Sequence, residues 1–176
     1  MGSDIATTAL VDEAMKRSGL VWLRWSDPPR TQAFWHSWLG GRAYLLTGPG
    51  EQPDPRLDED ERVEVIVRSK DNAQRLVVYP ADTTRLRPRD DDWKAATSSL
   101  AAARLNLADA AHAPERWSTD EATTIYRLAP GSELLQRPDS YPDESGRATP
   151  VPTSATTAGK PPRVRHRRGG GGPPLS

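Results

Sequence analysis

Alternating hydrophobic and polar positions mark short strands along this chain. The clearest case is the stretch 30–47, RTQAFWHSWLGGRAYLLT, in which two extended runs, 33–39 and 43–47, flank Gly40-Gly41. Successive side chains of a strand point to opposite faces, so each run can cover a core with one face. A glycine pair between two such runs predicts a tight antiparallel hairpin, which we expect at the centre of a sheet.

The same patterning predicts further strands on both sides of this hairpin. They cover residues 20–25, 62–68, 74–86 and 123–128. Valines alternate with other residues in 62–68, which is typical of a strand with one buried face. Pro80 cannot donate a hydrogen bond to a ladder, so we expect an edge, a bulge or a break at this point of the longest strand.

Two helices are predicted from apolar residues at helical spacing. The first begins near Asp4, a suitable N-cap, and ends at Gly19. The second opens with the three aspartates 90–92, where the helix dipole favours negative charge, and runs to about residue 107. Pro114 breaks the pattern, and we place Trp117 in a short connector before the last strand.

Prolines interrupt two parts of the chain. Three of them in 48–55 prevent this segment from continuing a ladder, so we expect a long loop of the kind that often carries function. The segment 136–176 holds eight prolines, a basic run at 160–168 and four successive glycines, and it has no apolar face to bury. We therefore predict one domain over 1–135 and a disordered, Pro/Gly-rich basic tail over 136–176.

The formal net charge of zero conceals an uneven distribution. Residues 1–135 carry 17 Lys or Arg against 21 Asp or Glu, whereas residues 136–176 carry 7 against 3. A mildly acidic body lacks the basic face of a folded nucleic-acid platform. Binding to nucleic acid is therefore expected only through the tail. The alternative is that the tail is a solubilising extension.

The composition also bounds location and chemistry. The 176 residues include no cysteine, which removes disulfides, thiolate metal sites and cysteine catalysis. The first 20 residues carry acidic side chains and lack the apolar core of a signal peptide, and no apolar run reaches membrane-spanning length. We expect a soluble cytoplasmic protein without membrane contact. The three histidines are scattered, so no metal site is expected.

Three features have both a functional and a structural interpretation. Six of the eleven aromatic residues lie between Trp22 and Tyr44, where they can form the wall of a ring-binding site or the core and interface of a small barrel. His36 can donate to a ligand or shuttle a proton, or it can be a hydrogen-bonded structural residue. Arg68 and Lys70, at a strand end, can cradle an anion or face solvent. The structural interpretation is the commoner one in each case.

The order of these elements resembles the FMN-binding split β-barrel superfamily. That superfamily includes pyridoxamine 5′-phosphate oxidase-like proteins and relatives that use the deazaflavin F420. The resemblance is carried by MKRSGLVWL at 15–23, FWHSWLGGRAYLLT at 34–47 and RVEVIVRSK at 62–70. It implies a mainly β (α+β) fold, an antiparallel split β-barrel of about six strands with an N-terminal helix and a helix near 90–107.

The resemblance also implies a homodimer with FMN or F420 in clefts between the protomers. Such proteins are oxidoreductases acting on small organic molecules when they are enzymes; the alternative is a cofactor-free dimeric scaffold or interaction protein. The resemblance does not identify catalytic residues. Carried over by position, the residues predicted to bind the cofactor are Trp35, His36 and Trp38 at the ring, and Thr47, Arg68 and Lys70 at the phosphate.

One departure from the family pattern concerns the loop after the hairpin. Family members that bind the cofactor usually place Lys or Arg there, and this chain has Glu51. A carboxylate beside a phosphate is unfavourable unless an arginine such as Arg42 or Arg56 compensates it. We therefore expect Glu51→Lys to tighten cofactor binding if the cleft is a weak anion site, and to leave binding unchanged if the cleft is unused.

Overall fold

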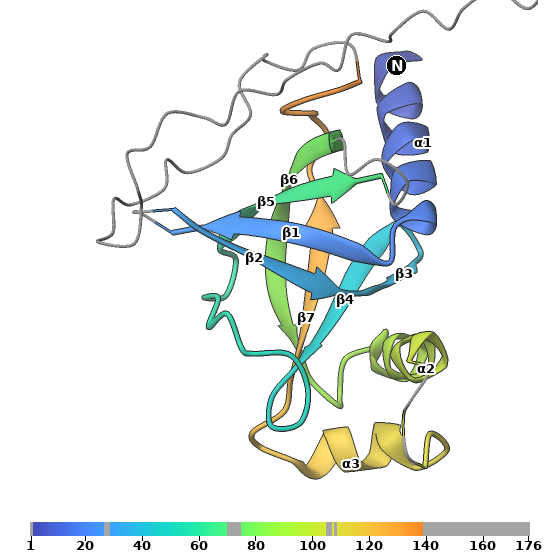
Figure 1. The fold of residues 1–176 in the computed structure, drawn as a ribbon. Coiled ribbons are helices and arrows are strands. Elements are labelled where there is room, and N and C mark those ends of the chain that lie inside the picture. Colours follow the sequence, from blue (N-terminus) through green and yellow to red (C-terminus); the bar gives the residue numbers. More distant parts are fainter. Residues whose placement is uncertain (1, 27–28, 70–74, 105–106, 108, 139–176) are drawn as a thin grey trace, which may run out of the picture. The chain divides into compact units, whose positions relative to one another are not determined.

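The computed structural model describes residues 2–26, 29–69, 75–104, 107 and 109–138. Seven strands and three helices follow one another along these residues (Figure 1). In chain order the elements are α1 (Gly2–Arg17), β1 (Leu20–Trp25), β2 (Arg30–Trp35), β3 (Ser37–Leu39), β4 (Arg42–Thr47), β5 (Arg62–Arg68), β6 (Arg75–Leu86), α2 (Trp93–Ala103), α3 (Ala113–Thr119) and β7 (Thr124–Pro130).

All seven strands belong to one antiparallel sheet with the order β2-β1-β5-β6-β7-β4-β3. The two edge strands of this order, β2 and β3, are separated in sequence only by His36. The stretch that contains them pairs with β1 through its first half and with β4 through its second. The sheet therefore curls round on itself, as a split barrel requires, and the expectation of an antiparallel β-barrel is confirmed.

The prediction of one continuous strand over 33–39 at the centre of the sheet is wrong. The strand is interrupted at His36, and only 37–39 forms the predicted hairpin with β4 around Gly40-Gly41. Both glycines have positive φ, as that tight turn demands. The interruption has a physical reason, because the chain must bend where it leaves β1 and joins β4. A pattern read along one strand contains no signal for this change of partner.

The interior of the barrel is the main core. β1 and β5 alternate between buried and more exposed positions, as predicted, and their buried residues include Val21, Leu23 and Val65. Helix α1 packs against this core through Val11 and Met15. A small barrel closed at one end by an amphipathic helix buries most of its apolar side chains, and this burial dominates its stability.

A second apolar cluster lies on the outer face of the sheet, under α2 and α3 (Figure 1). Leu46, Leu86 and Ile125 contribute from the strands, and Leu100 and Trp117 contribute from the helices. The short segment predicted as a connector is thus a helix, with Trp117 almost fully buried. Pro114 lies in its first turn, where a missing N–H leaves no bond unmade, so this proline begins a helix as well as ending the preceding pattern.

Two helix ends differ from the expectations, whereas Pro80 agrees with the expected edge. α1 begins at Gly2, before Asp4, and α2 ends at Ala103, short of residue 107. Strand β6 runs through Pro80 without a break. Its ladder with β7 begins only at Ala81, so Pro80 precedes that pairing and lies at a local edge.

The long loop between β4 and β5 packs into the mouth of the barrel. Leu57 is fully buried in the main core. The Thr83 hydroxyl donates to the backbone carbonyls of Asp58 and Glu61, at 3.0 and 2.8 Å. The Tyr126 hydroxyl donates to Asp54 over 2.7 Å. The prolines of this loop therefore belong to a segment that closes one end of the core.

The predicted tail, 136–176, lies outside the described residues from 139 onward. Gln136, just beyond the predicted domain boundary, still forms an antiparallel bridge with Val78. The basic run 160–168 falls wholly outside the described residues. Among the helices of the described part, none has both the length and the apolar character needed to cross a bilayer.

Candidate functional site

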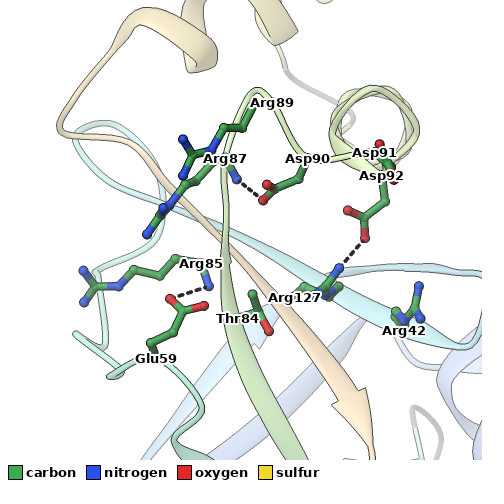
Figure 2. A pocket seen from close by; sticks show the side chains of 10 residues that line it. All are labelled: Arg42, Glu59, Thr84, Arg85, Arg87, Arg89, Asp90, Asp91, Asp92 and Arg127. Atoms are coloured by element: carbon green, nitrogen blue, oxygen red, sulfur yellow. Dashed lines mark hydrogen bonds and ion pairs between the residues drawn. The ribbon is translucent and has the colours of Figure 1, made fainter.

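A hollow of about 680 Å³ opens on the outer face of the sheet, beside the start of α2 (Figure 2). We call it the arginine pocket. It is lined by five arginines, four acidic residues and a threonine: Arg42, Glu59, Thr84, Arg85, Arg87, Arg89, Asp90, Asp91, Asp92 and Arg127.

The strand register explains why the hollow lies there. Tyr44, Arg127 and Thr84 are cross-strand partners on β4, β7 and β6, so they share the outer face. The next row toward the helices is apolar and covered by α2 and α3; it consists of Leu46, Ile125 and Leu86. The helical layer thus stops one row short of Arg127 and leaves a polar floor.

Asp92 fixes one wall of the pocket. Its Oδ2 accepts hydrogen bonds from Arg127 Nη1 at 3.0 Å and from the Tyr44 hydroxyl at 3.1 Å. Burial acts to raise the pKa of Asp92, but the bonds from Arg127 and Tyr44 outweigh it and leave the pKa below its ordinary value. Asp92 is therefore ionised at neutral pH, and it neutralises Arg127.

Two other carboxylates of the pocket bind backbone groups. Asp90 accepts from the Arg87 backbone N–H at 2.8 Å, and Glu59 accepts from the Arg85 backbone N–H at 3.4 Å (Figure 2). The Arg85 guanidinium itself donates to the Leu57 carbonyl at 2.9 Å. Both carboxylates therefore stabilise the backbone around the pocket, and neither pairs with a guanidinium group of a described residue. Among the described residues, no three His, Cys, Asp or Glu side chains gather as metal ligands would.

Three guanidinium groups remain for a ligand. Arg87 and Arg89 are exposed, and within the described part of the chain neither side chain has an acidic partner. Arg42, also exposed, lies beside the Tyr44 hydroxyl. An arginine fork matches the oxygens of phosphate and carboxylate and stays protonated at all physiological pH values. Arg87 and Arg89 lie together on one side of the pocket, and Arg42 lies apart from them beyond Arg127 (Figure 2). The Arg87–Arg89 side can therefore bind an oxyanion.

The residues predicted to bind a cofactor lie in different parts of the fold. Gln52 links Trp35 to the end of β4. Its side chain accepts from the Trp35 N–H at 2.7 Å and donates to the Trp35 carbonyl at 3.0 Å and the Leu46 carbonyl at 3.1 Å, and its backbone forms a bridge with Thr47. Thr47 is fully buried, and its hydroxyl donates to the Thr124 carbonyl at 3.0 Å. That hydroxyl is already used within the barrel.

The open face of Trp35 is also covered. The Arg104 guanidinium lies 5.7 Å from the centre of the Trp35 ring and forms an ion pair with Glu51. Gly48, at the start of the loop, is packed so tightly that a Cβ there would lie 2.7 Å from the Ala122 carbonyl oxygen. We call the group Trp35, Thr47, Glu51, Gln52 and Arg104 the Trp35 corner; the chain fills it with its own side chains.

His36 and Trp38 face the α1 end of the barrel. His36 is 7% exposed, and burial lowers its pKa to about 4 despite a hydrogen bond to the backbone of Met15, so the imidazole is neutral at pH 7. Its Nδ1 has no hydrogen-bond partner among the described residues. The Trp38 Nε1–H donates to Asp12 Oδ1 on α1 at 2.7 Å. Both side chains therefore hold α1 against the sheet.

Arg68 lies two strands from Trp35, with β1 between them. Its guanidinium stacks on Trp22 at 5.5 Å from the ring centre. Lys70, its predicted partner at the phosphate, falls outside the described residues. The structure thus joins Trp35 with Thr47 and places Trp38 and Arg68 elsewhere.

Sequence reasoning missed most of the arginine pocket. It considered Arg42 only as a compensating charge, and it used the aspartates 90–92 only as a helix start. A signal was present, because Arg85, Arg87 and Arg89 recur at every second position around the end of a strand. The strand ends at Leu86, so Arg87 and Arg89 lie in the turn after it, and the spacing alone does not fix which way their side chains point.

Comparison with known proteins finds similarity in structure only. No protein-family model matches the sequence, and no curated protein matches it. The haem storage protein HutZ from Vibrio cholerae is similar with a TM-score of 0.52 and 12% identity, over 70% of this chain and 89% of that one. The protein Atu2129 of unknown function from Agrobacterium tumefaciens is similar with a TM-score of 0.53 and 16% identity, over 78% of this chain and 58% of that one.

A pyridoxamine 5′-phosphate oxidase-related, FMN binding protein from Nostoc punctiforme is similar with a TM-score of 0.41 and 14% identity, over 72% of this chain and 78% of that one. The likeness to HutZ and Atu2129, at 12% and 16% identity, is one of fold. The predicted split-barrel fold is confirmed by the strand order of the sheet itself.

Proposed function

We propose that this protein binds a phosphorylated flavin-type cofactor, FMN or F420, and that the phosphate group lies in the arginine pocket. One observation carries the proposal: Arg42, Arg87 and Arg89 line a hollow and have no acidic partner among the described residues. Burying one face of a phosphate against such groups replaces water by charge-assisted hydrogen bonds, each worth about 1.5–3 kcal/mol.

The donor set fits the phosphate but not the ring. None of the ten lining residues is aromatic, so the pocket offers no surface on which an isoalloxazine would stack. Trp35 is covered by Arg104, and His36 is buried. Of the predicted ring contacts, only the one at Trp35 would open if Arg104 moved, because His36 and Trp38 face α1. Any further stacking surface would have to come from another protomer.

A homodimer is part of the proposal for this reason. Three large apolar side chains of the strands are more than a third exposed: Leu20 at 53%, Trp22 at 36% and Leu39 at 38%. Leu20 and Trp22 occupy alternate positions of β1 and so share one face of that strand, which is the surface we propose for a second copy of the chain. The similar fold of HutZ, a haem storage protein, agrees with a cofactor-binding role for this chain but does not select the cofactor.

When bound, a flavin-type cofactor supplies two-electron redox chemistry. The chain's contribution would be to hold the phosphate with Arg87 and Arg89, while Arg42 adds positive charge at the far side of the pocket and Asp92 keeps Arg127 neutralised. As an enzyme, the protein would act as an oxidoreductase on a small organic molecule.

The proposal is tested by the absorbance spectrum of the freshly purified protein, followed by titration with FMN and with F420 at low salt. We expect bound cofactor or saturable uptake, weakened by added salt because the arginines are exposed. The variant Arg87→Ala/Arg89→Ala should bind at least tenfold more weakly. The matched control Arg17→Ala/Arg30→Ala removes the same charge outside the pocket and should bind like the parent chain. No uptake of either cofactor by the parent chain contradicts the proposal.

A second candidate function is that of a cofactor-free scaffold or interaction protein. The Trp35 corner favours it, because the cleft predicted to hold the cofactor is filled by Glu51 and Arg104, and the Thr47 hydroxyl is used within the barrel. Under this alternative neither cofactor binds, while the oligomeric state of the chain remains unchanged when either is added.

A further inference from the structure

A second hollow, of about 500 Å³, lies between α1 and the ends of β3 and β7. We call it the Trp38 hollow. Its lining residues are Thr7, Thr8, Val11, Asp12, Trp38, Gly41, Pro130, Gly131 and Ser132. A volume of about 500 Å³ falls in the range of about 300–1,000 Å³ that is usual for sites of small organic ligands. It shares no lining residue with the arginine pocket.

The aromatic wall of this hollow is held in place before any ligand arrives. Trp38 is half-buried, and its indole N–H donates to Asp12 Oδ1 at 2.7 Å. The other oxygen of Asp12 pairs with Lys16 at 2.6 Å. Hydrogen bonds from Lys16 and then from Trp38 lower the pKa of Asp12, so these contacts persist at neutral pH. A ring fixed in this way loses little conformational entropy when a ligand stacks on it.

Two glycines, Gly41 and Gly131, also line the hollow. One borders open space and the other is tightly packed. Gly41 has φ +75°, and nothing lies within 4 Å of the position that its Cβ would occupy. Gly131 is packed against Pro80, whose Cγ would lie 3.1 Å from a Cβ at that position. A side chain at 41 would be strained by the positive φ and would project into open space, and one at 131 would press against Pro80 and require a small local shift.

The lining selects a class of ligand by charge and polarity. Val11, Trp38 and Pro130 contribute apolar residues to the lining, and Thr7 and Ser132 are lining residues whose hydroxyl groups can donate or accept. No lysine or arginine lines the hollow, and its one carboxylate is Asp12. Asp12 is already paired with Lys16, which is not a lining residue, so the hollow offers an anion no free cation to replace its lost hydration.

We infer that the Trp38 hollow is a binding site for a planar aromatic molecule without negative charge, stacked on the Trp38 indole and hydrogen-bonded to the hydroxyls of Thr7 and Ser132. The inference stands independently of cofactor binding in the arginine pocket, which has the opposite charge preference.

The test uses three probes of one ring and different charge: indole, tryptamine and indole-3-acetate. Binding to the full chain is measured by saturation-transfer NMR and calorimetry. We expect saturable, one-to-one binding of indole and tryptamine, and binding of indole-3-acetate at least tenfold weaker. Absence of saturable indole binding, or equal binding of all three probes, would overturn the inference.

Variants locate the binding. Thr7→Phe places a ring in the hollow and should weaken indole binding at least tenfold. Ala9→Phe, on the exposed side of the same helix, adds the same ring outside the lining and should bind indole like the parent chain. Ser132→Phe fills the hollow from the opposite wall and gives an independent second blocking variant. Circular dichroism establishes that each variant folds; a folded Thr7→Phe or Ser132→Phe that binds indole normally contradicts the assignment.

Discussion

The Trp35 corner and the arginine pocket both bring arginines and carboxylates to the surface of the sheet. They differ in whether the arginines are paired with those carboxylates. In the corner, Arg104 pairs with Glu51, and Gln52 satisfies the backbone of Trp35. In the pocket, Asp90 and Glu59 bind backbone N–H groups, so Arg87 and Arg89 keep their charges for a ligand. The number of opposite charges therefore does not decide whether a site keeps free guanidinium groups. The deciding factor is whether each carboxylate binds an arginine side chain or a backbone N–H.

The largest expected effect on the free energy of unfolding is in the Trp35 corner. Glu51→Lys would place a second cation beside Arg104, at a pair whose side chains are only 10% and 27% exposed. We expect the free energy of unfolding to fall by about 3–4 kcal/mol, measured by urea denaturation. This replaces the expectation from sequence, in which the same change only strengthened anion binding.

The charge-swapped variant Glu51→Lys/Arg104→Glu is the control for this prediction. It restores an ion pair and should recover more than half of the lost free energy. If the single variant is as stable as the parent chain, the pair does not hold the corner closed, and the comparison between the two regions fails.

The next effect concerns His36, which adjoins Trp35. The folded-state pKa of about 4 lies below the ordinary 6.5, so the unfolded chain takes up a proton first as the pH falls. Stability from this residue is therefore complete above pH 6.5 and is lost between pH 6.5 and 4, by up to about 3 kcal/mol. Denaturation curves at several pH values should show this slope, and His36→Gln should remove it.

His112 provides a matched control, because its surroundings act in the opposite direction. It is exposed, and the hydrogen bond and charge of Asp109 raise its pKa. His112→Gln should therefore leave the loss of stability below pH 6.5 in place. A slope that disappears in His112→Gln and persists in His36→Gln would contradict the burial of a neutral His36.

A smaller effect is expected at Gln52, whose amide makes three hydrogen bonds to the backbone of Trp35 and Leu46. Gln52→Ala leaves those backbone groups without their partner and should lower the free energy of unfolding by about 2 kcal/mol. Gln32→Ala, on the same strand as Trp35, is the control and should change it by less than about 0.5 kcal/mol. Equal effects of the two variants would show that the corner is not held by Gln52.

The smallest effect on the free energy of unfolding is expected in the arginine pocket. Arg87→Ala/Arg89→Ala removes two exposed guanidinium groups with no acidic partner among the described residues, so the free energy of unfolding should change by less than about 0.5 kcal/mol. Thermal denaturation of the parent chain and the variant measures the difference. A loss of several kcal/mol would mean that these arginines hold the fold and are not kept for a ligand.

Local patterns predicted the fold well where a strand keeps one partner. The alternation in 20–25 and 62–68 gave β1 and β5, and the glycine pair at 40–41 gave the turn between β3 and β4. These patterns failed at His36, where the chain stops pairing with β1 and begins pairing with β4. The change of partner depends on the curvature of the whole sheet. Pro114 misled for a different reason, since a proline is as suitable in the first turn of a helix as after its end.

The site was less predictable than the fold. Position along the hairpin grouped Trp35, His36 and Trp38, but the bend at His36 sends the flanking tryptophans to different clusters. The acidity of Glu51 was recognised, whereas its partner Arg104 lies 53 positions further along the chain. The arginine pocket combines β4, β6, β7, the loop between β4 and β5 and the loop before α2, and only the folded sheet brings these residues together.

The central claim is that Arg42, Arg87 and Arg89 are kept for an oxyanion while Arg104 is not. It is tested most directly by following the arginine Nε–Hε signals in NMR spectra of the isotope-labelled full chain during titration with pyrophosphate. We predict saturable shifts of the Arg87 and Arg89 signals, a smaller one at Arg42, and none at Arg104. Saturable shifts at Arg104 without shifts at Arg87 and Arg89, or no saturable shift at any of them, would contradict the account.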